Sequence, residues 1–194
     1  MEKDRLSAFS DGVIAIIITI MVLELKNPHG PDLSALTPVI RTLLCYVLSF
    51  IFVGIYWNNH HHMFHVVRHV DGMVLWANLH LLFWLSLTPF VMSWLGESGL
   101  HPWPVALYGV VLVMSAIAYY ILVRALLRIH GPETRLARAV GTDFKGRISV
   151  VIYVLAIPAA FLQPWISVAL YVAVAIMWLV PDRRMERALA QSES

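Results

Sequence analysis

The chain has 194 residues, of which 59% are hydrophobic and 13% are charged. A soluble domain is usually about half apolar and about a quarter charged, so this composition indicates a membrane protein. The formal net charge of +2 gives no reason to expect a nucleic-acid partner, and a single cysteine excludes an intrachain disulfide.

Six apolar segments follow one another along the chain, separated by short stretches rich in Pro, Gly, polar or charged residues. They cover roughly 8–25, 37–57, 73–95, 103–127, 148–162 and 165–180. A helix of roughly 17–25 residues crosses a bilayer. We therefore expect an all-α membrane protein with six transmembrane helices per subunit. The expected organisation is one six-helix transmembrane domain over 1–181 and a short cytoplasmic tail over 182–194.

Lys and Arg are distributed unevenly between the loops. With the N-terminus inside, twelve of them fall in cytoplasmic segments, whereas Lys26 and Arg41 alone fall outside. Basic residues accumulate on the cytoplasmic side of membrane proteins, so we expect both termini to be cytoplasmic. The largest basic cluster is the loop after the fourth segment, where setting the topology and contacting anionic lipid are the expected roles and regulation is the alternative.

Polar residues are expected at one depth near the cytoplasmic ends of the first three helices. They are Arg5, Ser10 and Asp11 in helix 1, Asn58, Asn59 and His60–His62 in helix 2, and Asn78 and His80 in helix 3. Lipid offers no hydrogen-bond partners, so these groups must satisfy one another. We expect a network that ties the three helices together, with Asp11 accepting a hydrogen bond from a His, an Asn or Arg5.

The histidines of this region also invite other interpretations. His61, His65 and His69 stand four residues apart, a spacing that metal ligands use, but no cysteine is near, so we expect no bound metal and no cofactor. Histidine titrates near neutral pH, which leaves a pH-sensing role open. Asp11 with His61 or His80 is the one candidate catalytic cluster, and without a defined nucleophile it does not indicate an enzyme.

Helix 1 carries one continuous apolar stripe. At about 100° per residue, Gly12, Ile16, Thr19, Ile20 and Leu23 lie on one face, and Asp11 lies on the far side. If Asp11 is satisfied by helices 2 and 3 of its own subunit, the stripe is left to face another subunit or a symmetry axis. Ordinary packing between helices is the alternative, and the spacing does not decide between them.

Three blocks of sequence resemble a known family. They are R-x-x-x-F-S-D at Arg5–Asp11 before an Ile-rich helix, Y-W-N-N-H-H-H-M-F at Tyr56–Phe64, and N-L-H-L-L-F-W-L-S-L-T-P-F at Asn78–Phe90. Together they are similar to the transmembrane protein 175 family of potassium channels, in its short bacterial form with one six-helix repeat. The specific similarity covers about the first 95 residues, and the rest matches in hydropathy only.

The resemblance implies a potassium-favouring cation channel in the cell (inner or plasma) membrane, formed by four copies around a central pore that helix 1 lines. The family lacks a T-V-G-Y-G filter, and so does this chain. A ring of Ile16 would form the constriction, with Thr19, Ile20 and Leu23 further along the pore. The expected structural polar network is Arg5, Phe9, Ser10, Asp11, His61, Asn78 and His80. The alternative function is a small proton-linked secondary transporter that uses Asp11 and the histidines of helices 2 and 3.

Overall fold

The structure is a computed structural model that describes residues 3–37, 39–67, 69–131, 134, 137 and 143–179. Its helices are α1 (Lys3–Leu23), the 3-10 turn η1 (Leu33–Leu36), α2 (Ile40–Val66), α3 (Gly72–Ser86), α4 (Thr88–Glu97), α5 (Pro102–His130), α7 (Phe144–Leu162) and α8 (Pro164–Leu179). The expected tail over 182–194 lies outside the described residues.

Five of the described helical segments are long and apolar enough to cross a membrane, and α3 and α4 together form one of them. The shorter apolar helix α8 ends where the described residues end. The expectation of an all-α membrane fold built from apolar helices is confirmed.

Besides shifts of a few residues at several helix ends, two boundaries differ from the expected ones in a way that affects the site. The second segment was expected to end at Trp57, but α2 continues through the histidines to Val66, because His60, Met63 and Phe64 give this extension a buried side. The third segment is divided at Leu87. Pro89 has no N–H to donate to the carbonyl of Leu85, so the helix is interrupted there.

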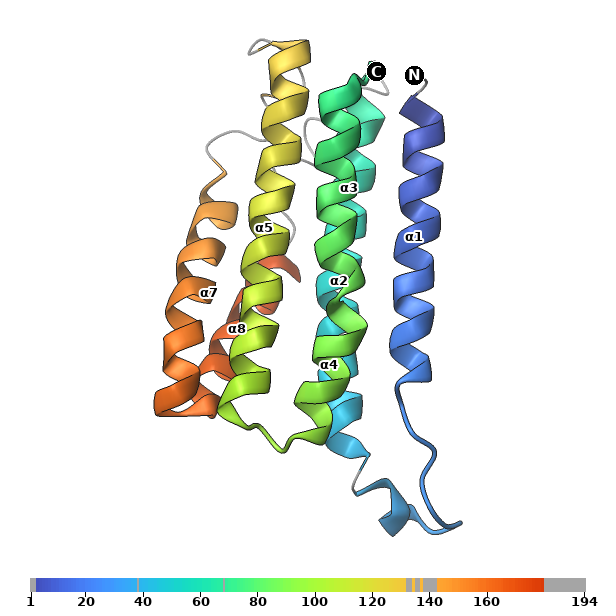
Figure 1. Ribbon diagram of the computed structural model, residues 1–194, viewed down its shortest axis with the longest axis vertical. Helices are drawn as coiled ribbons and strands as arrows, with labels where there is room; N and C mark the ends of the chain where they lie inside the picture. The colour runs from blue at the N-terminus through green and yellow to red at the C-terminus, as the bar shows by residue number, and fades with distance from the viewer. Residues whose placement is uncertain are drawn as a thin grey trace.

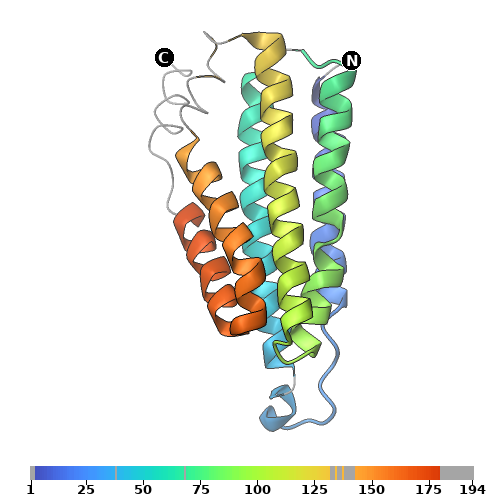
Figure 2. The same ribbon diagram turned by 60° about the vertical axis from the view of Figure 1, so that its left-hand side comes forward.

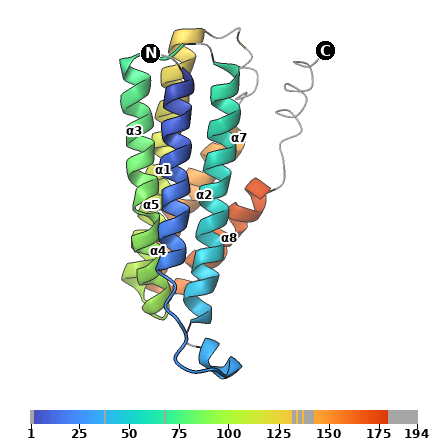
Figure 3. The ribbon, with the colours of Figure 1, turned by 90° about the vertical axis from the view of Figure 1, so that its right-hand side faces the viewer.

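The helices form an elongated bundle in which α1 lies at one edge and the pair α7 and α8 lies at the opposite edge (Figure 1). α1 packs against α2, α3 and α4, while α5 packs against α3, α4, α7 and α8. Viewed from the side of α1, this helix lies in front of the bundle between α2 and α3 (Figure 3). One side of α1 is therefore covered by its own subunit and the other side is not.

Close approach between helices supports the bundle away from α1. A Cβ added at Gly109 of α5 would collide with the hydroxyl of Tyr171 on α8. That hydroxyl donates a hydrogen bond to the carbonyl of Val105 at 3.0 Å, so it is held in place. Small residues let membrane helices come this close, and Gly109 is such a position.

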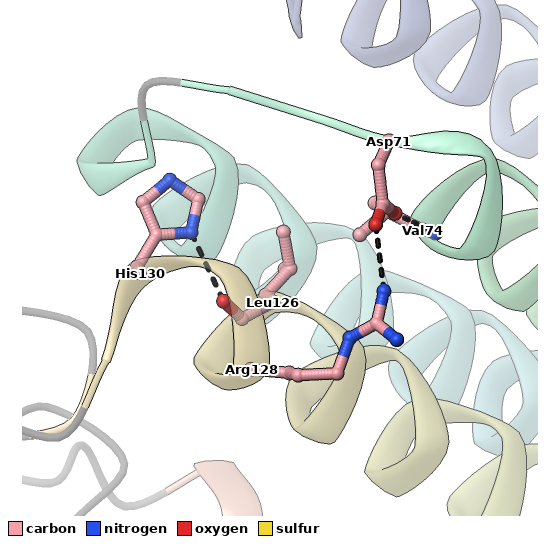
Figure 4. Close-up of polar contacts among 5 residues, drawn as sticks. All are labelled: Asp71, Val74, Leu126, Arg128 and His130. Carbon is pink, nitrogen blue, oxygen red and sulfur yellow. Dashed lines mark hydrogen bonds and ion pairs between the residues drawn. The ribbon is translucent and has the colours of Figure 1, made fainter.

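The turn between α2 and α3 is attached to the end of α5 (Figure 4). Asp71 accepts a hydrogen bond from the backbone N–H of Val74, which caps α3, and its second oxygen lies 2.7 Å from Nη2 of Arg128 on α5. His130 adds a contact, because its Nε2 accepts a hydrogen bond from the backbone N–H of His69 at 3.4 Å. We call this the N-terminal end of the bundle, since α1 begins there.

Candidate functional site

The two faces of α1 differ sharply in exposure. The residues that pack against the rest of the subunit are Leu6, Ser10, Ile14, Ile17 and Met21. On the opposite face, Ile16 is 59% exposed, Ile20 is 41% exposed and Leu23 is 75% exposed. No described residue covers this row of large apolar side chains. They lie on the face of the helix that the spacing of the apolar residues predicts. We call Gly12, Ile16, Thr19, Ile20 and Leu23 the α1 stripe.

Thr19 is the polar member of the α1 stripe. Its hydroxyl is exposed and donates a hydrogen bond to the carbonyl of Ala15 at 2.9 Å. The proton is therefore used inside the helix, and the oxygen lone pairs are left available on the uncovered face. A Cβ added at Gly12, one helical turn before Ile16, would meet no atom within 4 Å, so the stripe is open there as well.

A hydrogen-bonded chain inside the bundle anchors α1 to α3 and α2. The hydroxyl of Ser10 donates to the carbonyl of Leu6 at 2.9 Å and accepts from Nδ2 of Asn78, also at 2.9 Å. The remaining amide oxygen of Asn78 lies 2.8 Å from Nε2 of His60. All three side chains are fully buried. We call Ser10, Asn78 and His60 the buried triad.

The buried triad determines the tautomer of its histidine. The amide nitrogen of Asn78 donates to Ser10, so its Oδ1 faces His60, and an amide oxygen only accepts. Nε2 of His60 must therefore carry the proton. Nδ1 is buried and finds no hydrogen-bond partner in the described structure, and the ring stacks on Phe64 with centroids 4.4 Å apart.

Asp11 is held by the same subunit but not by the expected donor. Its Oδ1 accepts a hydrogen bond from Nε1 of Trp57 on α2 at 2.9 Å. The expectation that a His, an Asn or Arg5 donates to Asp11 was therefore wrong. His61 contributes indirectly, because its ring stacks on Trp57 with centroids 5.8 Å apart. The carboxylate thus points toward α2 and away from the α1 stripe.

The structure does not join the remaining candidate residues to the buried triad. His80 accepts a hydrogen bond from Trp84 of its own helix at 2.9 Å. Arg5 is exposed and makes no ion pair within the described part of the chain. Phe9 is 52% exposed and lies on the same side of α1 as Ile16.

The described residues contain no group of three or more His, Cys, Asp or Glu side chains that could hold a metal ion.

Trp57 was absent from the site residues expected from the sequence. His60 was expected only as one of the polar residues at the end of helix 2, and His61 was chosen for the structural network. The structure distinguishes the two histidines: Ser49 and Val53 are buried on α2 and His60 continues their face about two turns further on, whereas His61 lies about 100° away. Trp57 was missed because its indole counts as apolar in a hydropathy pattern, although the indole N–H needs an acceptor.

The apolar helices, the buried triad and the uncovered α1 stripe define an integral, multi-pass membrane protein. The family model of the endosomal/lysosomal potassium channel TMEM175 matches residues 5–89. A potassium channel of Chryseobacterium sp. (strain P1-3) is 53% identical over 192 residues, covering 99% of this chain and 100% of that protein. A potassium channel of Streptomyces collinus is 30% identical over 188 residues, 91% of each chain.

A solved structure gives the same result. The crystal structure of a lysosomal potassium-selective channel TMEM175 homolog from Chamaesiphon minutus matches with a TM-score of 0.76 at 27% identity, covering 92% of this chain and 96% of that one. The chain belongs to the TMEM175 family. The resemblance expected from the motif in α1 and the two downstream blocks is confirmed.

Proposed function

We propose that the protein is a potassium-favouring cation channel of the bacterial plasma membrane, in which four copies place α1 around a central pore. The observation that carries this proposal is the α1 stripe, which faces away from the subunit at Ile16, Ile20 and Leu23. The relatives that match over nearly the whole chain are potassium channels, which supports permeation as the function. We orient both termini toward the cytoplasm, following the distribution of Lys and Arg.

The pore mechanism follows from the chemistry of the α1 stripe. Four Ile16 side chains around an axis make a narrow apolar ring, and such a constriction closes by excluding water. Opening then requires α1 to rotate or move outward. This movement lengthens or breaks the hydrogen bond between Ser10 and Asn78 and the one between Trp57 and Asp11. Both hydrogen bonds therefore favour the closed position.

Potassium preference is assigned to Thr19. Because its proton is donated to Ala15, four hydroxyl oxygens present lone pairs to the pore axis and can replace part of the hydration shell of an ion. Hydroxyl groups carry no net charge, so the expected preference for potassium over sodium is modest. Glu24, just beyond the end of α1, would raise the local concentration of cations at the outer mouth.

The alternative, a proton-linked carrier using Asp11, receives less support. A carrier needs its acidic residue on the substrate path, whereas Asp11 accepts a hydrogen bond from Trp57 of α2 in the same subunit. Asp11 also lies about 140° around the helix from Ile16, which favours a pore in which the carboxylate does not face the axis.

The test is planar-bilayer recording of purified protein with potassium on one side and sodium on the other. Discrete unitary currents that reverse toward the potassium equilibrium potential are expected. Absence of unitary currents, together with slow ion flux that follows an imposed proton gradient, would replace the channel with the carrier. Vesicles prepared without protein provide the baseline for both measurements.

A further inference from the structure

A cavity of about 400 Å³ lies between α2, α5, α7 and α8, and the proposed pore does not use it. It is on the side of α2 away from α1, since α7 and α8 occupy the opposite edge of the bundle (Figure 1). In the rotated view, the N-terminal end of α7 leans away from α5 (Figure 2). The volume is in the range of about 300–1,000 Å³ that is typical of ligand sites.

The cavity is long and apolar. On α7 its lining runs from Asp143 to Tyr153, which at about 1.5 Å per helical residue is a depth of about 15 Å. Its inner end is closed by Phe52 and Tyr153, both buried, with ring centroids 6.2 Å apart. Tyr56 and Tyr119 form part of the wall between α2 and α5, again in edge-to-face contact. A slot of this depth with aromatic walls suits a hydrocarbon chain.

The outer end of the cavity is polar, and further basic residues lie near it. Arg147 lines it and is exposed, without an ion pair among the described residues. Arg124 follows Tyr120, another lining residue, by one turn on the same face of α5. Among the described residues that line the cavity, the one carboxylate is Asp143, which accepts a hydrogen bond from the backbone N–H of Gly146 at 3.2 Å and so caps α7. Lys145 adds a further positive charge to the same helix end.

The surroundings indicate how a ligand enters. The outward face of α7 beside the cavity carries Val151, Val154 and Leu155, which are 55%, 50% and 61% exposed. In a membrane this face contacts hydrocarbon, and Arg147 lies at the helix end where headgroups begin. A ligand that is apolar along its length and anionic at one end therefore enters sideways from the bilayer.

We infer that this cavity holds one acyl chain of an anionic membrane phospholipid, with the lipid phosphate beside Arg147. The chain occupies the slot down to Phe52 and Tyr153, and the headgroup contacts the polar outer end. Basic residues near a membrane surface each favour an anionic lipid by about 1 kcal/mol. The bound lipid would bridge α2, which packs on α1, to α5, α7 and α8.

The test measures lipid binding by native mass spectrometry of the purified protein in detergent, with dioleoyl-phosphatidylglycerol and dioleoyl-phosphatidylcholine added at equal concentrations. The matched pair of variants is Val150→Phe, which fills the cavity, and Val151→Phe, which adds the same ring on the exposed neighbouring residue. We expect Val150→Phe to abolish the first phosphatidylglycerol adduct and Val151→Phe to leave it unchanged.

The headgroup is tested with Arg147→Gln, which should lower the apparent affinity for phosphatidylglycerol about fivefold and leave phosphatidylcholine unaffected. Lys3→Gln, at the same end of the bundle on a helix that does not line the cavity, is the charge control. Equal binding to the Val150→Phe and Val151→Phe variants, or no preference of the native protein for phosphatidylglycerol, overturns the inference. If Val150→Phe does not fold, Ala116→Leu fills the same space from α5. Because no ion current enters the measurement, the result is independent of the proposed channel function.

Discussion

Nε2 of His60 donates a hydrogen bond to Oδ1 of Asn78 at 2.8 Å, and both side chains are completely buried. The residues belong to α2 and α3, and Asn78 continues the connection to Ser10 of α1. A chain of three hydrogen-bonded polar side chains in a mainly apolar interior specifies how the three helices are placed around one another, because any other placement leaves buried donors unpaired. The position of the α1 stripe therefore depends on contacts on the opposite side of α1.

The first prediction concerns this chain. Asn78→Leu preserves the approximate volume but leaves the Nε2–H of His60 buried without an acceptor, which should cost about 1–3 kcal/mol of stability. The double variant His60→Phe with Asn78→Leu removes both partners and should recover part of the loss. Thermal unfolding in detergent measures both, and His65→Phe, at an exposed position of the same helix, is the control. A double variant no more stable than Asn78→Leu would show that the hydrogen bond is not what stabilises this site.

The second prediction concerns the proposed gate. Ile16→Asn places a polar amide at the constriction, so water should enter the pore and the current at rest should increase several-fold. Val22→Asn makes the same change at an exposed position of α1 outside the stripe and should leave the current unchanged. Bilayer recording compares the two. Equal currents from both variants and the native protein would remove Ile16 as the gate.

The third prediction concerns ion preference. Thr19→Val removes the hydroxyl oxygen at nearly constant shape, so potassium and sodium permeabilities should approach each other while the pore still conducts. Thr19→Ser keeps a hydroxyl group that can donate to the carbonyl of Ala15 as that of Thr19 does. This variant should retain the native preference for potassium over sodium. The reversal potential under potassium and sodium gradients reports both. An unaltered reversal potential in Thr19→Val would place the discrimination elsewhere.

The number and approximate positions of the apolar segments were predictable because transfer into lipid selects long apolar runs whatever their packing. The stripe on α1 was predictable for a related reason, since side-chain direction in a single helix follows from about 3.6 residues per turn. Helix ends were less predictable. α2 extends past Trp57 because of packing on His60 and Phe64, and the division of the third segment depends on the single residue Pro89.

The polar contacts were predictable only as a group. Composition indicated that α1, α2 and α3 share a buried network, and Ser10 and Asn78 are indeed in contact. The choice between His60 and His61, one residue apart, depends on the rotation of α2 about its axis, which polarity does not determine. Trp57 was missed as the donor to Asp11 because an indole counts as apolar in a hydropathy pattern, although its N–H must be satisfied within the membrane.

The fourth prediction concerns the packing of α5 on α8. Gly109→Ala should reduce stability by about 1–3 kcal/mol, because its Cβ collides with the hydroxyl of Tyr171. Tyr171→Phe removes that oxygen, so it should cost less in the Gly109→Ala background than in the native one, a coupling that a double-mutant cycle measures. Gly54→Ala, where nothing lies within 4 Å of the added atom, is the control and should not destabilise. Additive effects of the two substitutions would contradict the proposed collision.

The fifth prediction concerns pH. The pKa of Asp71 is lowered below its ordinary value of 3.8, mainly by the hydrogen bond from the backbone N–H of Val74 (Figure 4). The hydrogen bond and the positive charge of Arg128 lower it further. A carboxyl group whose pKa is lowered in the folded state stabilises the fold above its unfolded pKa, and this contribution is lost as pH falls through the folded pKa.

The melting temperature of the native protein should therefore decrease as the pH is lowered below about 4. Asp71→Asn can still cap α3, because asparagine accepts a hydrogen bond at this position, but it has no charge to pair with Arg128. The variant should melt at a lower temperature near neutral pH. Its melting temperature should also decrease less than that of the native protein as the pH is lowered below about 4. Asp32→Asn, at a helix start where the side chain makes no capping bond, should reproduce the native curve. If the melting temperature of Asp71→Asn decreased as steeply at low pH as that of the native protein, other carboxyl groups would cause the decrease. The attachment of the α2–α3 turn to α5 would then not depend on the charge of Asp71.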